Sequence, residues 1–201
     1  KVWTNQSKRS YQSKIMNWKT GLMNADNWKS NWISVIDRDR DVPQAPYFIN
    51  DFRLNKKIIS ASLYITSRGV YEAHINGVRV GDSFLTPGWT SYSNRIQYQA
   101  YDVKEMLIEG ENRIGVVLAD GWFKNFKPNQ GNRITNYGKS TSFISEMIIT
   151  YHDGSKESII DDQNWNYHFG AIRSSSIYNG ETIDLNLYDH LWAQPYNQNN
   201  H

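Results

Sequence analysis

The chain has 201 residues, of which 39% are hydrophobic, 21% charged and 14% aromatic, and it contains no cysteine. The absence of cysteine excludes disulfides, thiol catalysis and zinc–thiolate sites, and a chain of this length can bury a core without them. The net charge of +2 with no dense basic block lacks the electrostatic footprint of a nucleic-acid-binding protein. No apolar run approaches the roughly 18 residues of a membrane span.

The first fifty residues predict little regular structure. The run 14–21 is a short strand-like stretch that ends in glycine, and 24–29 has the composition of a single helical turn. The stretch 37–46 alternates charged residues and contains two prolines. Because this pattern is poor material for a helix or a strand, we interpret the stretch as an exposed connector.

From Tyr47 onward the sequence favours strands and tight turns. Asn76-Gly77 and the run 152–155 predict hairpin turns, since Asn and Gly tolerate a positive φ. Residues 103–107 predict a short helix with Asp102 as its N-cap. Mostly alternating apolar side chains predict strands at 47–54, 58–66, 69–75, 78–82, 95–101, 112–119, 141–151 and 156–160. Many short strands joined by close turns predict an all-β sandwich.

Common catalytic signatures are missing from the sequence. It has no Gly-x-Ser-x-Gly elbow and no phosphate-binding loop of the P-loop type, and the five histidines lack the spacing of a zinc site. Neighbouring carboxylates occur at 37/39/41, 109/111 and 161/162. In charged loops such residues are solvated more often than catalytic, although folding could bring two of them together for glycoside hydrolysis.

The polar stretch 119–132 is unusual because it carries three aromatic residues directly after an apolar strand. Long loops in compact domains are often functional, so one interpretation is a loop that faces a sugar or another domain. The alternative is that Trp122 and Phe123 fold back to cap the core. The eight Trp and thirteen Tyr of the chain suit either interpretation, since their rings combine a flat apolar face with a polar edge.

Several motifs occur in an order that is similar to a known family. The run 69–82 contains Asn76-Gly77, and it continues into Pro87-Gly88-Trp89 within 85–92. Further motifs lie at 98–103, 109–112, 120–123, 173–175 and 178–184, with two more at 18–22 and 28–33. Over residues 15 to 195 the chain resembles the N-terminal β-sandwich domain of bacterial α-L-rhamnosidases and the segment that precedes it.

This resemblance implies a jelly-roll β-sandwich, galactose-binding-like, with one or two short helices. It also implies that the fragment alone is not an enzyme, since the two catalytic glutamates of these inverting glycoside hydrolases lie in a separate (α/α)-barrel domain. We expect 1–35 to be the truncated tail of a preceding immunoglobulin-like domain plus linker, 36–195 to be the sandwich, and 196–201 to be a disordered tail. The usual setting of such enzymes indicates a periplasmic or secreted location.

The implied role is an accessory domain that supports domain packing and the shape of the substrate cleft, or that recognises a glycan. Its expected partners are the other domains of the rhamnosidase chain and a rhamnose-containing glycan, with no nucleic acid and no membrane span. Alternatives are a carbohydrate-binding module that acts on its own, with or without calcium, and a cell-surface protein-interaction module. The candidate carbohydrate-facing residues are Trp89, Tyr92, Asp120, Trp122, Phe123, Asn125 and Glu181.

The resemblance also bears on calcium. Some related sandwiches bind L-rhamnose through a calcium ion that an acidic–amide pair holds, and the corresponding positions here resemble Ser67-Arg68. A hydroxyl and a guanidinium cannot replace two anionic or amide ligands of a hard cation. We therefore expect no metal site and no cofactor in this chain, and the resemblance implies that it holds no catalytic residue.

Overall fold

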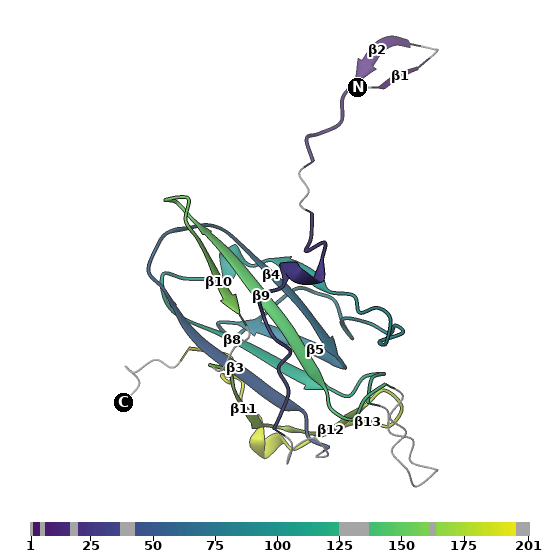
Figure 1. Ribbon diagram of the computed structural model, residues 1–201, viewed down its shortest axis with the longest axis vertical. Coiled ribbons are helices and arrows are strands. Elements are labelled where there is room, and N and C mark those ends of the chain that lie inside the picture. Colours follow the sequence, from purple (N-terminus) through teal and green to yellow (C-terminus); the bar gives the residue numbers. More distant parts are fainter. Residues whose placement is uncertain are drawn as a thin grey trace.

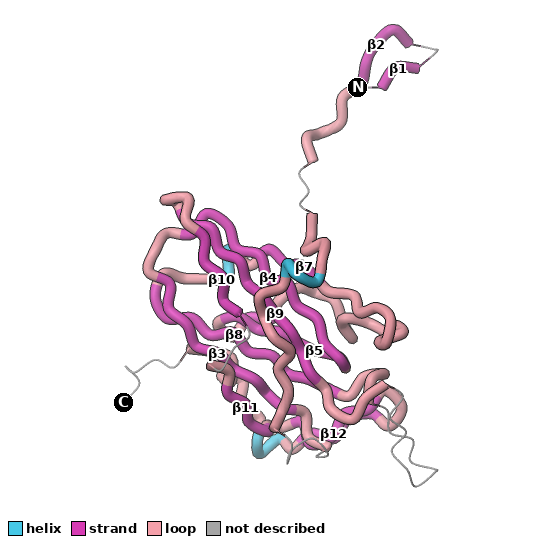
Figure 2. The backbone as a smooth tube through the Cα atoms, in the orientation of Figure 1, coloured by secondary structure: helices cyan, strands magenta, loops and turns pink. Residues whose placement is uncertain are grey.

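The computed structural model describes residues 2–4, 7–16, 20–36, 43–124, 137–160 and 164–195. The described part of the chain is strand and loop apart from three short 3-10 helices (Figure 2). These helices are η1 (Ala25–Asn27), η3 (Lys104–Met106) and η5 (Leu185–Leu187). The predicted all-β class is confirmed, and helices contribute only single turns to it.

Two antiparallel sheets face each other and form the sandwich (Figure 1). The first sheet has the order β10 (Lys156–Ile160), β9 (Ser142–Tyr151), β4 (Ile58–Arg68) and β7 (Gln99–Asp102). The second has the order β11 (Asn166–Phe169), β3 (Pro46–Leu54), β8 (Gly110–Ala119), β5 (Val70–Ile75) and β6 (Val78–Arg79). Two smaller sheets pair β1 (Val2–Thr4) with β2 (Ser7–Tyr11) and β12 (Ile172–Ser176) with β13 (Gly180–Ile183).

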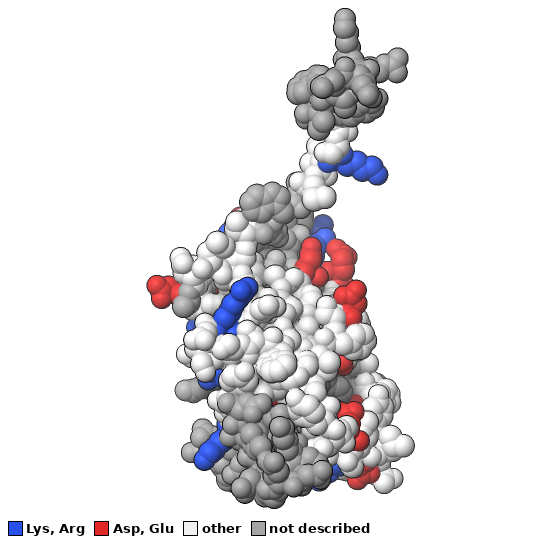
Figure 3. All heavy atoms as spheres, turned by 90° about the vertical axis from the view of Figure 1, so that its right-hand side faces the viewer, with Lys and Arg blue, Asp and Glu red and all other residues white. Residues whose placement is uncertain are grey.

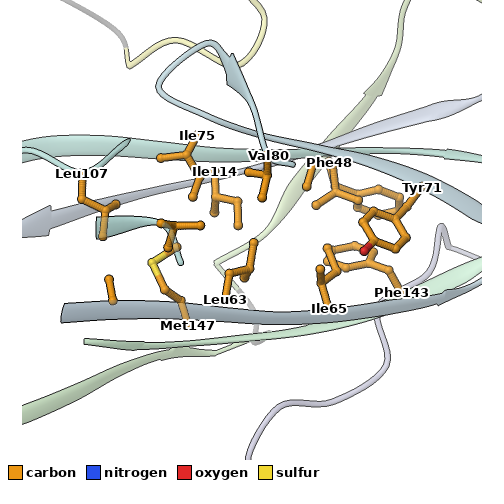
Figure 4. Packing of buried hydrophobic residues seen from close by; sticks show 14 of the residues in the cluster. Phe48, Leu63, Ile65, Tyr71, Ile75, Val80, Leu107, Ile114, Phe143 and Met147 are labelled. Atoms are coloured by element: carbon orange, nitrogen blue, oxygen red, sulfur yellow. The ribbon is translucent and has the colours of Figure 1, made fainter. Parts of the chain in front are cut away.

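The core lies between the two large sheets and follows the strand alternation of the sequence. Every second residue of a strand points to the same face, so Leu63 and Ile65 of β4 meet Ile114 of β8 in the interior (Figure 4). Phe48 of β3 packs against Phe143 of β9 across the sandwich, with ring centroids 5.2 Å apart. These contacts join the two sheets into one apolar core.

The two predicted hairpins are confirmed. Asn76 and Gly77 have φ values of 52° and 82° at the turn between β5 and β6, as a two-residue turn with both residues at positive φ requires. The turn between β9 and β10 is closed by Asp153, whose side chain accepts a hydrogen bond from the backbone N–H of Ser155 at 2.9 Å.

Other elements differ from their predicted bounds. The run 14–21 forms no strand in its described residues, whereas the predicted turn at 24–29 contains η1. The predicted strand 95–101 begins only at Gln99, because the backbone N–H groups of Asn94 and Arg95 turn back to the carbonyl oxygen of Ser91. The predicted helix at 103–107 is the single turn η3, whose N-cap is Val103 and not the predicted Asp102. Asp102, one residue earlier, accepts a hydrogen bond from the Lys104 N–H at 3.2 Å.

A segment before β3 extends the first sheet. Ile33 exchanges two backbone hydrogen bonds of 2.8 and 3.0 Å with Phe143 of β9, and Ser34 donates to the carbonyl oxygen of Thr141 at 2.8 Å. The Lys29 N–H donates to the buried carboxylate of Glu146 at 2.8 Å. Residues 28–36 therefore run alongside β9 beyond the end of β10 (Figure 1). The predicted division at residue 35 stays a prediction.

A charged cluster on the second sheet gives the chain a pH-dependent contribution to stability. Glu72 accepts hydrogen bonds from His74 at 2.7 Å and from Arg79 at 2.9 Å, and the His74 contact is the larger cause of the lowered pKa of Glu72. A carboxyl with a lowered pKa stabilises the fold above its ordinary pKa and loses that contribution as the pH falls through the folded-state value. Glu72→Gln should therefore lower the free energy of unfolding by roughly 0.5 kcal/mol at about pH 7. The effect is small because Glu72 and its two partners are partly exposed to solvent.

The measurement is thermal unfolding of the parent chain and Glu72→Gln at about pH 7 and about pH 3. The difference between the two chains should shrink at the lower pH. An equal difference at both pH values would show that the ionised carboxylate of Glu72 is not the source of the stabilisation.

Candidate functional site

Two loops bring two of the predicted carbohydrate-facing side chains together. Trp89 lies in the loop that follows β6, and Trp122 lies directly after β8. Their rings are nearly parallel, with an interplanar angle of 6° and centroids 6.2 Å apart. Trp89 is 62% exposed and Trp122 is half-buried. We call this stacked arrangement the Trp89–Trp122 pair, and Trp89 is its solvent-exposed member.

Two other predicted residues, on the same loops as this pair, are buried. Tyr92 and Phe123 are both buried, and their ring centroids are 5.2 Å apart. The Tyr92 hydroxyl donates to the carbonyl oxygen of Gly88 at 3.1 Å, and burial raises the pKa of this phenol. Tyr92 and Phe123 therefore support the loops from inside. In the described part of this stretch, residues 119–124, Phe123 folds back into the interior and Trp122 is half-buried, while a role in facing a sugar or another domain stays a prediction.

The backbone between Asp120 and Trp122 requires glycine. Gly121 has a φ of 54°, and a Cβ atom there would lie 2.8 Å from Cγ1 of Val70 and 3.1 Å from the backbone of Gly69. A side chain at this position would collide with the start of β5. This close approach fixes the direction in which Trp122 leaves the sheet.

The two predicted acidic residues have different surroundings. Asp120 lies 3.7 Å from the ammonium of Lys124, and both line a small hollow together with Ser175 of β12. Glu181 of β13 is the register partner of Ser175 and is exposed. Asp120 is thus held by a cation at this hollow, while Glu181 stands on the outside of the adjacent hairpin. Asn125 lies outside the described residues.

Ser67 and Arg68 point to opposite faces of β4. Ser67 is fully buried, and the Arg68 guanidinium lies on the surface 4.5 Å from the ring centroid of Trp32. In the described part of the chain, no three His, Asp or Glu side chains gather as metal ligands would. The expectation of no calcium stays a prediction.

Two further hollows bring together residues that the sequence prediction did not identify as a site. One, of about 240 Å³, lies beside β11 and is lined by Tyr47, His168, Phe169, Gly170, Ala171, Leu187, Tyr188, Asp189, His190 and Trp192. The other, of about 370 Å³, is lined by Trp28, Ser30, Asn31, Trp32, Thr66, Ile96, Tyr98 and Ile144. The residues that line each hollow come from segments far apart in the chain. The aromatic-rich run 28–32 was the one local feature of the sequence that could have indicated either hollow. Neither hollow, nor the small one at Asp120, is lined by two carboxylates.

One face of the molecule is poor in charge. Figure 3 shows acidic side chains along one margin of this face and Lys and Arg side chains toward the opposite margin, with uncharged residues over most of the described centre between them. Among the described residues, no helix is long and apolar enough to cross a bilayer. The predicted periplasmic or secreted location stays a prediction.

Fold and loops together define an antiparallel β-sandwich domain with paired aromatic side chains at its rim. The sequence pattern of the family described as "Alpha-L-rhamnosidase N-terminal domain" matches residues 56–201, and the chain belongs to this family. This match confirms the resemblance inferred from the motifs.

Characterised relatives agree with this assignment. An alpha-L-rhamnosidase of Formosa agariphila is 34% identical over 96% of this chain, and one of Streptomyces avermitilis is 38% identical over 73% of it. The chain spans only 22% and 14% of these two relatives. It therefore corresponds to a small part of each of these much longer proteins.

Solved structures of such enzymes contain a similar domain. The native alpha-L-rhamnosidase from Aspergillus terreus matches with a TM-score of 0.78 and 36% identity, over 87% of this chain and 20% of that one. The Streptomyces avermitilis enzyme complexed with L-rhamnose matches with a TM-score of 0.72 and 35% identity, over 79% and 15% of the two chains. The sandwich fold is thus shared with these enzymes.

Proposed function

We propose that this chain is a non-catalytic accessory domain of an α-L-rhamnosidase, a glycoside hydrolase that removes terminal α-L-rhamnosyl groups. The observation that carries the proposal is the family match combined with the small share, 14–22%, of the curated relatives that the chain spans. The site supports it as well. Glycoside hydrolysis usually needs two carboxyl groups on either side of the scissile bond, and each of the three hollows described above is lined by at most one.

An assay on an aryl α-L-rhamnoside tests the proposal. The purified 201-residue chain should release no phenol above the buffer rate, because it would lack the acid and base of the reaction. A longer protein that contains this domain should hydrolyse the same substrate. Saturable hydrolysis by the purified chain alone would contradict the proposal.

The accessory role that we favour is packing against the rest of the parent chain. The segment around η5 exposes Leu185 by 78% and Tyr188 by 66%, and Ile183, Leu187 and Leu191 are each close to half exposed. Apolar side chains gathered along one short segment are typical of an interaction surface. A neighbouring domain would remove them from water, and the relatives' much greater length supplies such domains.

Charged substitutions on this segment should destabilise the longer protein but not the isolated chain. In the longer protein, Leu185→Glu with Tyr188→Glu should lower Tm by several degrees, because burial of two carboxylates opposes docking. In the 201-residue chain the same substitutions should leave Tm almost unchanged, since both side chains are exposed. Thermal unfolding of both proteins provides the measurement.

The matched control is Ile108→Glu, which places a carboxylate at a 55% exposed apolar residue elsewhere on the surface. It should leave Tm of both proteins unchanged. If the substitutions at Leu185 and Tyr188 affect the two proteins equally, the segment around η5 is not a docking surface.

A second candidate role is glycan recognition at the Trp89–Trp122 pair, which the parallel indole rings favour. Flat aromatic surfaces suit the apolar faces of sugars. Titration of the chain with L-rhamnose and a rhamnosyl disaccharide, with and without calcium, tests this role. Saturable shifts at these two indoles would support it, and calcium dependence would reverse the expectation drawn from Ser67-Arg68.

A further inference from the structure

The 370 Å³ hollow is a groove on the outer face of the first sheet, away from the core. Its floor is formed by Thr66 of β4 and Ile144 of β9, which are register partners and are both buried. One wall comes from the segment 28–32 and the other from residues 96–98 before β7. The groove therefore exists because the N-terminal segment lies along β9 and leaves space in front of β4.

Direct contacts fix both walls. The Trp28 ring meets the Tyr98 ring edge to face, with centroids 5.7 Å apart, and the Tyr98 hydroxyl donates to the carbonyl oxygen of Leu22 at 3.1 Å. Thr66 donates to the carbonyl oxygen of Gln97 at 2.5 Å. These contacts hold the groove in shape without a ligand, which lowers the entropic cost of binding.

The Trp32 ring is supported from the sheet. The Arg68 guanidinium lies 4.5 Å from the centroid of this ring, a distance at which a cation is attracted to the aromatic face. Trp32 is 37% exposed, so its indole stays accessible while Arg68 limits its movement.

The chemistry of the lining suits a sugar with apolar faces. Trp28, Trp32 and Tyr98 provide aromatic surfaces, and Ile96 and Ile144 add aliphatic ones. The Asn31 amide is exposed and makes no hydrogen bond to another described side chain or backbone group, and no acidic or basic side chain lines the groove. Ligand pockets combine such apolar walls with a few polar groups that fix orientation.

We infer that this groove is a saccharide-binding subsite for one or two neutral pyranose rings of the 6-deoxy type, separate from the Trp89–Trp122 pair. A 6-deoxy sugar has a methyl group that the isoleucines can contact, C–H faces that the indoles can stack against, and hydroxyls that the exposed Asn31 amide can bind. The choice of L-rhamnose within this sugar class rests on the proposed function. The presence of a saccharide subsite rests on the groove itself.

The test is a titration of the isotope-labelled 201-residue chain with L-rhamnose and a rhamnosyl disaccharide, followed at the indole N–H signals. Signals of Trp28 and Trp32 should shift saturably. Asn31→Ala and Trp32→Ala should each weaken this binding about tenfold or more, because they remove a hydrogen-bonding group and a stacking surface. The Asn31 side chain is exposed, so its removal leaves the fold intact.

Phe84→Ala is the matched control. Phe84 is an aromatic residue that is 79% exposed, and the Arg79 guanidinium lies 4.5 Å from its ring centroid, as the Arg68 guanidinium does at Trp32. Phe84 does not line the groove. This variant should bind as the parent chain does. Shifts confined to the Trp89–Trp122 pair, unchanged binding by Asn31→Ala, or no saturable shift at Trp28 and Trp32 would each overturn the inference. Hydrolysis by the longer protein tests the proposed function separately.

Discussion

Phe143→Ala is expected to lower the free energy of unfolding by about 3–5 kcal/mol, the usual cost of removing a fully buried aromatic ring. The Phe143 ring is 0% exposed, and its centroid lies 5.2 Å from that of Phe48 and 4.9 Å from that of Trp165. It therefore joins the first sheet to the second (Figure 4) and packs against the chain before β11. Its removal leaves a cavity that rigid strands on both sides cannot close.

Urea unfolding followed by circular dichroism measures this loss. Phe143→Leu should cost clearly less than Phe143→Ala, because leucine fills part of the cavity. A cost of less than about 1 kcal/mol for Phe143→Ala would mean that the two sheets repack without this ring.

Asn112→Ala should lower the free energy of unfolding by about 3 kcal/mol, although it removes no apolar group. Asn112 is 0% exposed, and its Oδ1 accepts hydrogen bonds from the side chain of Asn76 at 2.9 Å and from the Ile108 N–H at 3.0 Å. Its Nδ2 donates to the carbonyl oxygens of Ile108 at 2.8 Å and Gly110 at 2.9 Å. Alanine would remove all four hydrogen bonds of this buried amide, and the Asn76 amide would keep its hydrogen bond to the carbonyl oxygen of Met106 at 2.9 Å.

The same urea experiment measures this second loss, with Asn94→Ala as the control. Asn94 is exposed, and its side chain donates one hydrogen bond, to Ser91 at 3.1 Å. Its substitution should change the free energy of unfolding by less than about 0.5 kcal/mol. Equal effects of the two asparagine substitutions would contradict the importance that we assign to the buried network.

Alternating strands could be predicted from the sequence, whereas polar strands could not. The predicted strand 156–160 has the same bounds as β10, and the predicted strands 47–54 and 141–151 differ from β3 and β9 by one residue. Strands β12 and β13 were not predicted, because they are short and partly or fully exposed. Such strands lack the buried face whose periodicity identifies a strand.

Local motifs could identify the loop aromatics but not their arrangement. The sequence placed Trp89 and Trp122 among the carbohydrate-facing candidates, and only the fold shows that their rings are parallel. It also named Tyr92 and Phe123, which are buried, because nothing in a loop sequence tells which ring turns inward. The groove around Trp32 is lined by four separate segments of the chain, so no single motif could have revealed it.

The pairing of Ile33 with Phe143 has a consequence for any shorter version of this chain. A version that begins after residue 36 would lose the segment that covers β9 next to β10. The freed N–H and C=O groups of Phe143 would then form an open edge, which is a template for intermolecular strand addition. Such a truncated version should self-associate through β9, even though every residue of the two large sheets is still present.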